Sequence, residues 1–541
     1  MRRLSILTTT ALFLSAAPYA YAQDEAVDVA KVRADATFLA DDLLQGREAG
    51  TPGYDIAANY VASRMLAMGI APGDADGDYM QDITYLDWKS GEDSVIRLGD
   101  TAFGIDSSFL FQNATGAPLE GSADLVFVGL GVSDPAIGLD FIGDTDLTDK
   151  IAVAIFSPSI PGAPADVGSH LVFHLPKALA ARGAKGLIYY FPPGAVPAEF
   201  HGEIREFLVD LHSAQPAVEG ELAYDLTPPL ALYGSVLDDA SEALFANATM
   251  SVDQYMQSMM SGTMVPAYSL GKTATYDLKG ELVETYRTSN VVGMIEGSDP
   301  ELRDELIVLT AHLDHVGIDE DAAPGEDNIF NGLFDNAMGV SAMLEAARLF
   351  TVSGEAPRRS IAFVALGAEE KGLKGSEWLA AHPERFPGKT MVGVVNLDMP
   401  VTPDDFDRVV AYGGEHSTIS AQIDTALSAL GVVQIEDPSP EEAYFVRSDH
   451  YSFVKAGIPS VMLEPIPVEA SKPLYDEFQE KHYHKVSDQI GLPLDWEAAG
   501  KFALVNYLIA RQMADADEAP RWYDDSYFGN AFAPDAAKAS R

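Results

Sequence analysis

Histidine and carboxylate side chains follow several short apolar runs in the second half of the chain. His312 and Asp314 come after LIVLTA, Glu369 and Glu370 after SIAFVAL, and Asp398 after MVGVVNL. Imidazole and carboxylate groups bind divalent transition metals, and an unligated carboxylate beside a metal-bound water can act as a general base. These residue types in these positions predict metal-assisted hydrolysis.

Two further candidates lie outside these runs. Asp335 opens the helix predicted for AMGVSAMLEAARLF, and His484 stands in the polar segment HYHKVSD. Taken singly, Asp335 would be read as a helix N-cap, Glu369 and Glu370 as a solvated loop, and His484 as an idle polar residue. Ligands of parallel sheets gather beyond the carboxyl ends of the strands, so five such groups at one edge favour a metal site instead.

The expected ligand set contains no thiol. His312, Asp335, Glu370, Asp398 and His484 offer two imidazoles and three carboxylates, one of which can bridge two ions. Because the sequence has no cysteine, such a set suits two Zn²⁺ ions, with Co²⁺ or Mn²⁺ as alternatives.

Two neighbouring acids are left for other roles. Asp314 lies two residues from His312, and we expect its carboxylate to accept the second ring N–H of that histidine and fix its tautomer. Glu369 is expected to be the general base that takes a proton from the attacking water.

The segments that must position these residues alternate in type. From Ser289 onward, apolar runs such as SIAFVAL and PSVMLE alternate with amphipathic helices, among them residues 337–350, 418–430 and 496–513. This alternation predicts an α/β fold, with a mostly parallel central sheet flanked by helices on both faces. Two helices predicted before residue 70 have no sheet of their own, so we expect them to pack on this later domain.

The middle of the chain has a different texture, because strand-like runs alternate there with proline-rich loops. This predicts a β-rich module inserted into the catalytic domain. The expected organisation is a signal peptide over residues 1–22, the N-terminal part of the catalytic domain over 23–112, the inserted module over 113–275, the catalytic domain proper over 276–515 and a C-terminal surface tail over 516–541.

Charge and the N-terminal segment limit the partners and the location. The chain has 82 acidic and 35 basic residues, which argues against nucleic acid and anionic membranes as partners. Arg2 and Arg3, the apolar stretch 4–17 and AYA before Gln23 predict a cleaved secretory signal peptide. We therefore expect an exported protein, periplasmic or secreted, without disulfides and without a stable membrane anchor.

The motifs also resemble those of a known family. TAHLDHVG, NGLFDNAMGVSAMLEAAR, RRSIAFVALGAEEKGLKGSE, VVNLDM, RSDHYSFVKAGIPSV and YHKVSD are similar, in order and spacing, to the series of the co-catalytic dinuclear zinc aminopeptidase and glutamate-carboxypeptidase-like metallopeptidase family. The similarity extends from Ser289 to about Met513, and FLADDLLQGREAGTPG resembles the N-terminal helix pair of that family. More loosely, VFVGLGV, DLTDKIAVAIF and KALAARGAKGLIYYF resemble a protease-associated domain.

This resemblance implies a role for each ligand. Asp335 would bridge two zinc ions. His312 and Asp398 would complete the ligands of one ion, and Glu370 and His484 those of the other.

The resemblance also implies that Glu369 is the general base and that Asp314 supports His312. Substrate contacts are expected from residues around the RSDH motif, namely Tyr444, Arg447, Asp449 and His450. Several members of the family have a tyrosine three residues before the serine of this motif. This chain has Phe445 there, so the resemblance does not carry over hydroxyl assistance at that position.

The predicted function is that of an exported dinuclear zinc exopeptidase acting on peptides, most simply an aminopeptidase, because the acids around the motifs suit an α-ammonium group. A carboxypeptidase for short or acidic peptides, using Arg447, is an alternative. A single-zinc glutaminyl cyclase-like enzyme and a non-catalytic binding protein are further alternatives, which the filled ligand positions disfavour. The sequence contains no indication of an oligomeric state.

Overall fold

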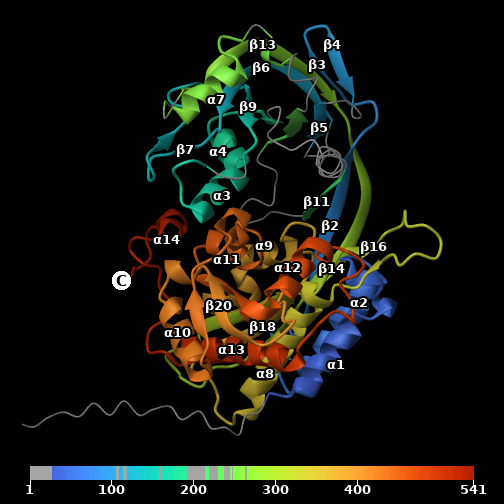
Figure 1. Cartoon of the computed structure of the whole chain (residues 1–541), viewed down its shortest axis with the longest axis vertical. Helices are drawn as coiled ribbons and strands as arrows, with labels where there is room; N and C mark the ends of the chain where they lie inside the picture. Colours follow the sequence, from blue (N-terminus) through green and yellow to red (C-terminus); the bar gives the residue numbers. More distant parts are fainter. Residues whose placement is uncertain are drawn as a thin grey trace, which may run out of the picture.

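The computed structural model describes residues 27–104, 109–113, 118–157, 160–191, 214–218, 230–236, 244–246, 248–261, 263 and 265–541. The predicted signal peptide, residues 1–22, lies outside this part of the chain. The described residues form a larger body and a smaller module above it (Figure 1). In these ranges, no helix has both the length and the apolar character needed to cross a membrane.

The larger body is built on one mixed sheet. Its strands follow the order β11 (Ala214–Val218), β2 (Met80–Ser90), β14 (Gly280–Ile295), β18 (Ser360–Leu366), β15 (Glu305–His312), β19 (Thr390–Asn396), β22 (Ser460–Pro467), β20 (Phe406–Tyr412) and β21 (Val433–Ile435), and β1 (Ala71–Pro72) pairs with β14. The central strands β18, β15, β19 and β22 are parallel to one another. Antiparallel pairs extend the sheet on either side of them. The predicted α/β fold, with a parallel sheet at its centre, is confirmed.

Helices cover both faces of this sheet. One face packs against α1 (Val29–Leu39), α2 (Pro52–Ala67), α8 (Met338–Val352), α10 (Ile419–Leu430) and α13 (Trp496–Asp515), and the other against α9 (Lys374–Ala381) and α11 (His450–Lys455). Successive residues of a strand point to opposite faces, so Ile307 joins the first of these cores and Val308 the second. This is why the central strands are apolar at nearly every position. The N-terminal helices α1 and α2 belong to the first core, as predicted.

The smaller module has a sheet and a core of its own. The strand order is β4 (Thr101–Gly104), β3 (Val95–Leu98), β13 (Tyr268–Leu278), β6 (Leu119–Gly129), β9 (Ile151–Ile155), β10 (Gly186–Tyr190), β12 (Leu232–Val236) and β5 (Phe109–Asn113). The helices α3 (Ala165–Phe173), α4 (Leu175–Ala181) and α7 (Val252–Met260) belong to the same module. The predicted insertion, residues 113–275, falls within the segment that builds this sheet. Its boundaries and its likeness to a protease-associated domain stay predictions.

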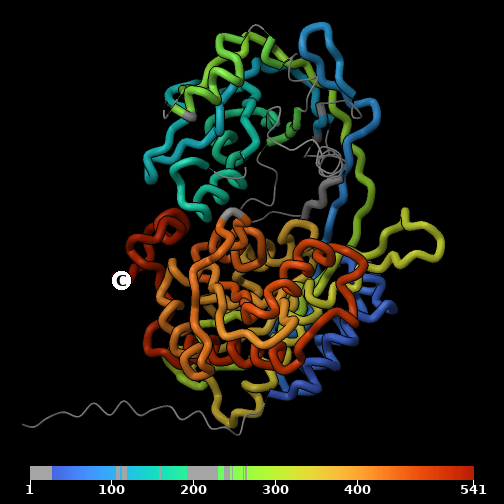
Figure 2. Tube along the Cα trace, in the orientation of Figure 1, coloured from blue at the N-terminus to red at the C-terminus, as the bar shows by residue number. Residues whose placement is uncertain are grey.

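Two long paired strands connect the bodies. The chain enters the module from the end of β2 and returns from it into β14, and these strands pair in antiparallel fashion from Ser90 with Gly280 to Met80 with Val291. Figure 2 shows the two strands side by side between the bodies.

The module also contacts the larger body through α3. The side chain of His170 hydrogen-bonds through Nδ1 to the hydroxyl of Tyr451 on α11. Asp166, near the start of α3, has its Oδ2 2.9 Å from His416 Nε2. These contacts fix one end of the module above the central sheet.

The C-terminal segment, residues 516–541, was expected as a surface tail, and this expectation is corrected by the structure. Trp522 is 2% exposed and Phe528, in α14 (Tyr527–Phe532), is fully buried. The hydroxyl of Tyr527 donates a hydrogen bond to Oδ2 of Asp134 in the module, at 2.5 Å. The aromatic side chains of this segment bury enough apolar surface to hold it against both bodies.

Candidate metal centre

Five polar side chains converge beyond the carboxyl ends of the central strands. His312 is the last residue of β15, whereas Glu370 and Asp398 lie in the loops after β18 and β19. Asp335 lies in the short segment Leu333–Ala337 that leads into α8, and His484 follows α12 (Lys472–Lys481). Because β18, β15 and β19 are parallel neighbours, the loops after them meet at one edge of the sheet.

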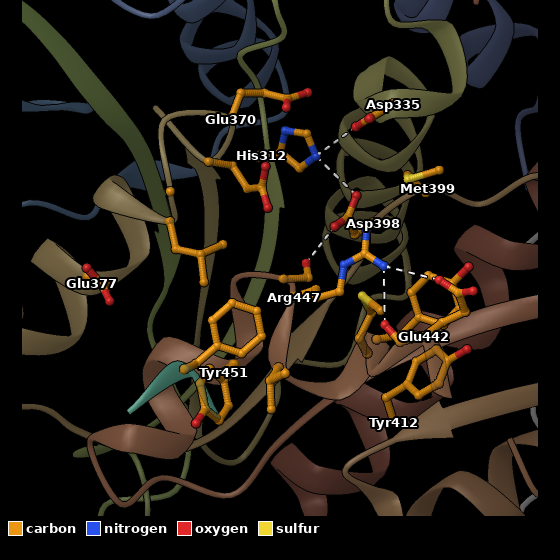
Figure 3. Close-up of a pocket in the computed structure, with 18 of the residues that line it drawn as sticks. His312, Asp335, Glu370, Glu377, Asp398, Met399, Tyr412, Glu442, Arg447 and Tyr451 are labelled. Carbon is orange, nitrogen blue, oxygen red and sulfur yellow. Dashed lines mark hydrogen bonds and ion pairs between the residues drawn. The ribbon is translucent and has the colours of Figure 1, made fainter. Parts of the chain in front are cut away.

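The carboxylate of Asp335 lies at the centre of this group. Its Oδ1 is 3.1 Å from His312 Nε2, and the same nitrogen is 3.1 Å from Asp398 Oδ1 (Figure 3). Its Oδ2 is 3.1 Å from His484 Nε2, which in turn is 3.2 Å from Glu370 Oε2. Each oxygen of Asp335 therefore lies near a histidine that in turn contacts a further carboxylate. This is the arrangement that a carboxylate needs in order to bridge two ions.

The electrostatics of the group fit divalent cations. Burial opposes the charge of His484, but hydrogen bonds to Asp335 and Glu370 outweigh it and raise the pKa of His484 to about 10. Burial and the charge of Asp335 act to raise the pKa of Glu370, yet its contacts with two histidines lower that pKa to about 2. The carboxylates thus favour positive charge beside them, and this positive charge offsets the cost of burying their negative charge. Borderline N and O donors of this kind suit Zn²⁺.

Glu369 stands apart from the ligand contacts. Its side chain lines the same cavity as His312, Asp335 and Glu370. Burial raises the pKa of Glu369 well above its usual range. The charge of His312 acts to lower this pKa, whereas the negative charges of Glu370 and Asp449 raise it further. A carboxyl group with this raised affinity for a proton, next to candidate metal ligands, has a property that suits a general base.

His315 contacts the cluster, and the sequence interpretation gave it no role. Its ring is 1% exposed, and Nδ1 lies 2.6 Å from Glu370 Oε1, while Glu370 Oε2 faces His484. His315 therefore fixes the orientation of the Glu370 carboxylate. The signal for it was the second histidine of the HLDH motif, one residue beyond Asp314.

Asp314 supports the site differently from the way we expected. The group near His312 Nδ1 is the main-chain carbonyl of Asp314, at 3.2 Å, rather than its carboxylate. The carboxylate accepts hydrogen bonds from the main-chain N–H groups of Glu369 and Glu370, at 3.1 and 3.2 Å. The buried Asp314 side chain thus shapes the loop that carries both glutamates. The physical reason is that two amide donors of the loop after β18 lie within hydrogen-bonding distance of this acid.

A hydrogen-bond chain orients Asp398. Ser448 donates to Asp398 Oδ2 at 2.5 Å, Asn396 donates to Ser448 Oγ at 2.8 Å, and Thr310 donates to Asn396 Oδ1 at 2.7 Å.

Asp488 supports the segment that carries Asp335. Both oxygens of Asp488 accept hydrogen bonds from main-chain N–H groups, including that of Asp335 at 3.1 Å. Such outer contacts orient metal ligands and tune their basicity. The sequence interpretation had assigned no role to these residues.

Arg47 is a buried cation behind the cluster and was also missed. It is 1% exposed, and its guanidinium donates to the carbonyls of Leu313, Asn331 and Gly332 at 2.9, 2.6 and 3.1 Å. Burial lowers its pKa to about 10, against the charges of Asp314 and other site acids, so it remains cationic. It joins the segment after β15 to the segment before Asp335. In the sequence it was visible only as the arginine of a turn-rich stretch.

The cluster opens into a cavity of 770 Å³ between the two bodies. Its far wall comes from the module and includes Phe173, His174, Pro176, Lys177 and Tyr233. Of the four predicted substrate contacts, Tyr444 and Arg447 line this cavity. Asp449 and His450 have no solvent exposure, because they lie at the buried start of α11, and they do not line the cavity.

Parts of this chain are similar to known peptidases. Residues 290–509 match the family model described as peptidase family M28. A probable zinc metalloprotease from Pyricularia oryzae is 25% identical over 266 residues, which cover 42% of this chain and 50% of that protein. Aminopeptidase YwaD from Bacillus subtilis is 29% identical over 192 residues, 35% of this chain and 38% of the relative. This chain therefore spans half or less of the length of these two relatives.

Among solved structures, an aminopeptidase from Aneurinibacillus sp. strain AM-1 aligns over 91% of this chain and 95% of its own, at 20% identity and a TM-score of 0.49. The family match itself extends over β15, β18, β19 and β22 and over every predicted ligand from His312 to His484. The resemblance drawn from the motifs is thereby confirmed. Residues 290–509 of this chain are thus similar to peptidase family M28.

Proposed function

We propose that this protein is a dinuclear zinc aminopeptidase, which releases N-terminal residues from peptides. The observation that carries the proposal is the placement of Asp335, whose two oxygens face two separate pairs of ligands. His312 and Asp398 would hold one ion, and Glu370 and His484 the other. Two ions so bound would lower the pKa of a water molecule and polarise the scissile carbonyl.

The chain supplies the proton transfers. Glu369 lies in the cavity beside the ligands, and its raised pKa suits it to take a proton from the attacking water. The same carboxyl group then gives that proton to the leaving amine, which is the step that breaks the peptide bond. The hydrogen bonds to Asp314 fix the backbone of the loop that carries Glu369 and Glu370, so that one can serve as base and the other as ligand.

Charge in the cavity supports an aminopeptidase over a carboxypeptidase. The cavity is lined by several acids, which favour the α-ammonium group of a substrate. Arg447, the cation expected to hold a substrate carboxylate, instead donates to the carbonyl of Glu442 at 3.2 Å and lies 3.6 Å from its carboxylate. This arginine already has a partner within the chain.

The test compares cleavage of one peptide whose N-terminus is free or acetylated and whose C-terminus is free or amidated. We expect the peptide with a free N-terminus to lose residues one at a time, whether its C-terminus is free or amidated. The N-acetylated peptide should resist, since it lacks the ammonium group. Cleavage of the acetylated peptide together with resistance of the amidated one would identify a carboxypeptidase instead.

Export belongs to the same proposal. We propose that residues 1–22 direct the protein out of the cytoplasm and are removed, so that it acts in the periplasm or outside the cell. Determination of the N-terminal residue of the protein recovered from each cell fraction tests this, and a cytoplasmic protein retaining Met1 would contradict it.

A further inference from the structure

A carboxylate on the strand next to β19 lines the same cavity as the candidate metal ligands. Asn396 of β19 pairs in parallel register with Met462 of β22. Two residues further along come Asp398, in the loop just after β19, and Glu464, which is still within β22. Asp398, Met462 and Glu464 all line the cavity. Glu464 is therefore placed one strand away from a predicted metal ligand, facing the same space.

Glu464 has no cationic partner within the described ranges of the chain. Its two oxygens accept hydrogen bonds from the hydroxyls of Tyr412 and Tyr475, which are neutral donors. Burial raises the pKa of Glu464, although the two hydroxyls act in the opposite direction. Burial of a carboxylate without a positive partner costs free energy of desolvation, and a cation bound beside it would offset that cost.

Two of the cations that line the cavity, Arg447 and Lys455, are paired with other acids. Arg447 is directed towards Glu442 (Figure 3). Its guanidinium lies 5.5 Å from the ring centre of Tyr444. Lys455 is paired with Glu377, which Figure 3 shows on the opposite side of the cavity from Tyr412. Neither side chain forms an ion pair with Glu464.

Aromatic and thioether groups form the walls around this carboxylate. The rings of Tyr412 and Tyr444 have their centres 5.6 Å apart, and both rings line the cavity together with Met462. Such walls accept the methylene chain of a long side chain, and tyrosine faces attract a cation. An anionic group between apolar walls matches a long side chain with a positive end.

We propose that Tyr412, Tyr444, Met462 and Glu464 form a subsite for the side chain of the substrate's N-terminal residue, and that it selects lysine and arginine. The proposal rests on the aminopeptidase function proposed above. The methylene stem would lie against Tyr412, Tyr444 and Met462, and the terminal ammonium or guanidinium would pair with Glu464. This pairing is a charge-assisted hydrogen bond, stronger than one between neutral groups.

Lysine and norleucine substrates test this subsite directly, because the two side chains share a four-carbon stem and differ in the terminal ammonium. We expect kcat/KM for an N-terminal lysine to exceed that for norleucine by about 10- to 100-fold in the unaltered protein, the range of a hydrogen bond to a charged group. In Glu464→Gln this ratio should fall to about 1, with activity on norleucine retained. Zinc content and the thermal midpoint should stay unchanged.

Glu442→Gln is the matched control, since it removes a cavity-lining acid that already has Arg447 as a partner. Its lysine-to-norleucine ratio should stay that of the unaltered protein. A preference for lysine that Glu464→Gln leaves intact overturns the subsite, and so does a preference for norleucine in the unaltered protein. An equal loss on both substrates would also overturn it, because Glu464 would then bind the α-ammonium group. If the unaltered protein cleaves neither substrate, the aminopeptidase proposal itself fails.

Discussion

Glu369 and Glu370 are adjacent in the chain but have opposite acid–base properties. Contacts with His315 and His484 lower the pKa of Glu370 to about 2, although burial opposes this. Burial raises the pKa of Glu369 well above its usual range. One acid is therefore suited to stay ionised as a ligand, and the other is suited to move a proton.

Replacement of Glu369 separates these two roles. We expect Glu369→Gln to lower kcat by about 10²- to 10⁴-fold, the usual contribution of general acid–base catalysis. Zinc content, measured by elemental analysis, should be unchanged because Glu369 makes none of the ligand contacts. Glu384→Gln, at an exposed position, is the control and should keep full activity. A near-normal rate in Glu369→Gln would refute the assignment of the base.

The sequence pointed to the residues that the structure gathers into one cluster, but not to the residues that support them. His312, Glu370 and Asp398 could be found because they follow recognisable buried strands. His315 and Asp488 act through contacts that depend on how distant loops meet, and no local pattern encodes those contacts. Asp314 was selected as a support, but its partner was wrong, since the choice between its carbonyl and its carboxylate depends on the loop after β18.

The loops that hold the ligands are joined by one side chain from the N-terminal elements. Arg47 belongs to the short helical segment Asp42–Arg47 between α1 and α2. Its hydrogen bonds reach the carbonyl of Leu313, next to a predicted ligand, and those of Asn331 and Gly332, just before Leu333–Ala337. The N-terminal helices thus contribute to the metal site as well as to the core.

Loss of this arginine should destabilise the whole catalytic body. We expect Arg47→Met to lower the free energy of unfolding by about 3 kcal/mol or more, because several buried carbonyls lose their donor. Denaturant titration measures this change. Arg303→Met, at an exposed position, should shift the same quantity by less than about 0.5 kcal/mol. Equal, small effects of the two substitutions would show that Arg47 does not hold the loops.

Helices and strands could be predicted from the sequence where they pack in the core of the catalytic body. Every residue of β18 is buried, so its apolar run was visible, and the predicted helices 337–350 and 496–513 closely match α8 and α13. The antiparallel extension by β2 and the first half of β14 was not expected. These strands are polar or exposed at many positions, because they bridge two bodies instead of crossing a core.

At the level of the whole molecule, the module and the catalytic body enclose the cavity together. His170 and His174 of the module lie in an aromatic cluster with Tyr451 and Phe532 of the larger body. Burial lowers the pKa of His170 to about 4 and that of His174 to about 2. Both rings are therefore neutral in the folded protein at neutral pH.

This contact should weaken in acid. Histidines of an unfolded chain take up protons below about pH 6.5, whereas these two resist protonation while folded. The stabilisation they provide is complete above pH 6.5 and decreases as pH falls, by at most about 1.4 kcal/mol per pH unit for each histidine. We expect the first thermal transition to move down between pH 6.5 and 5, and to move less in His170→Gln. Identical pH dependence of variant and parent would contradict this account of the interface.

The sequence indicated a separate β-rich module but not its position over the metal centre. That position depends on the curvature of β2 and β14 and on the C-terminal segment. The buried aromatic residues of that segment, Trp522 and Phe528, were not predicted to be buried, because the segment is acidic. A cavity shared between two bodies has no local sequence signature, because its walls come from distant parts of the chain.

Zinc titration of the metal-free protein is the most direct test of the central claim, that the cluster around Asp335 is a two-metal peptidase centre. The release of an N-terminal residue is measured at each addition, with bound zinc determined on the same samples. We expect no turnover without metal, activity that rises until two equivalents are bound, and loss of tight binding in Asp335→Ala. Full peptidase activity in the metal-free protein, or unchanged zinc binding in Asp335→Ala, would contradict the account.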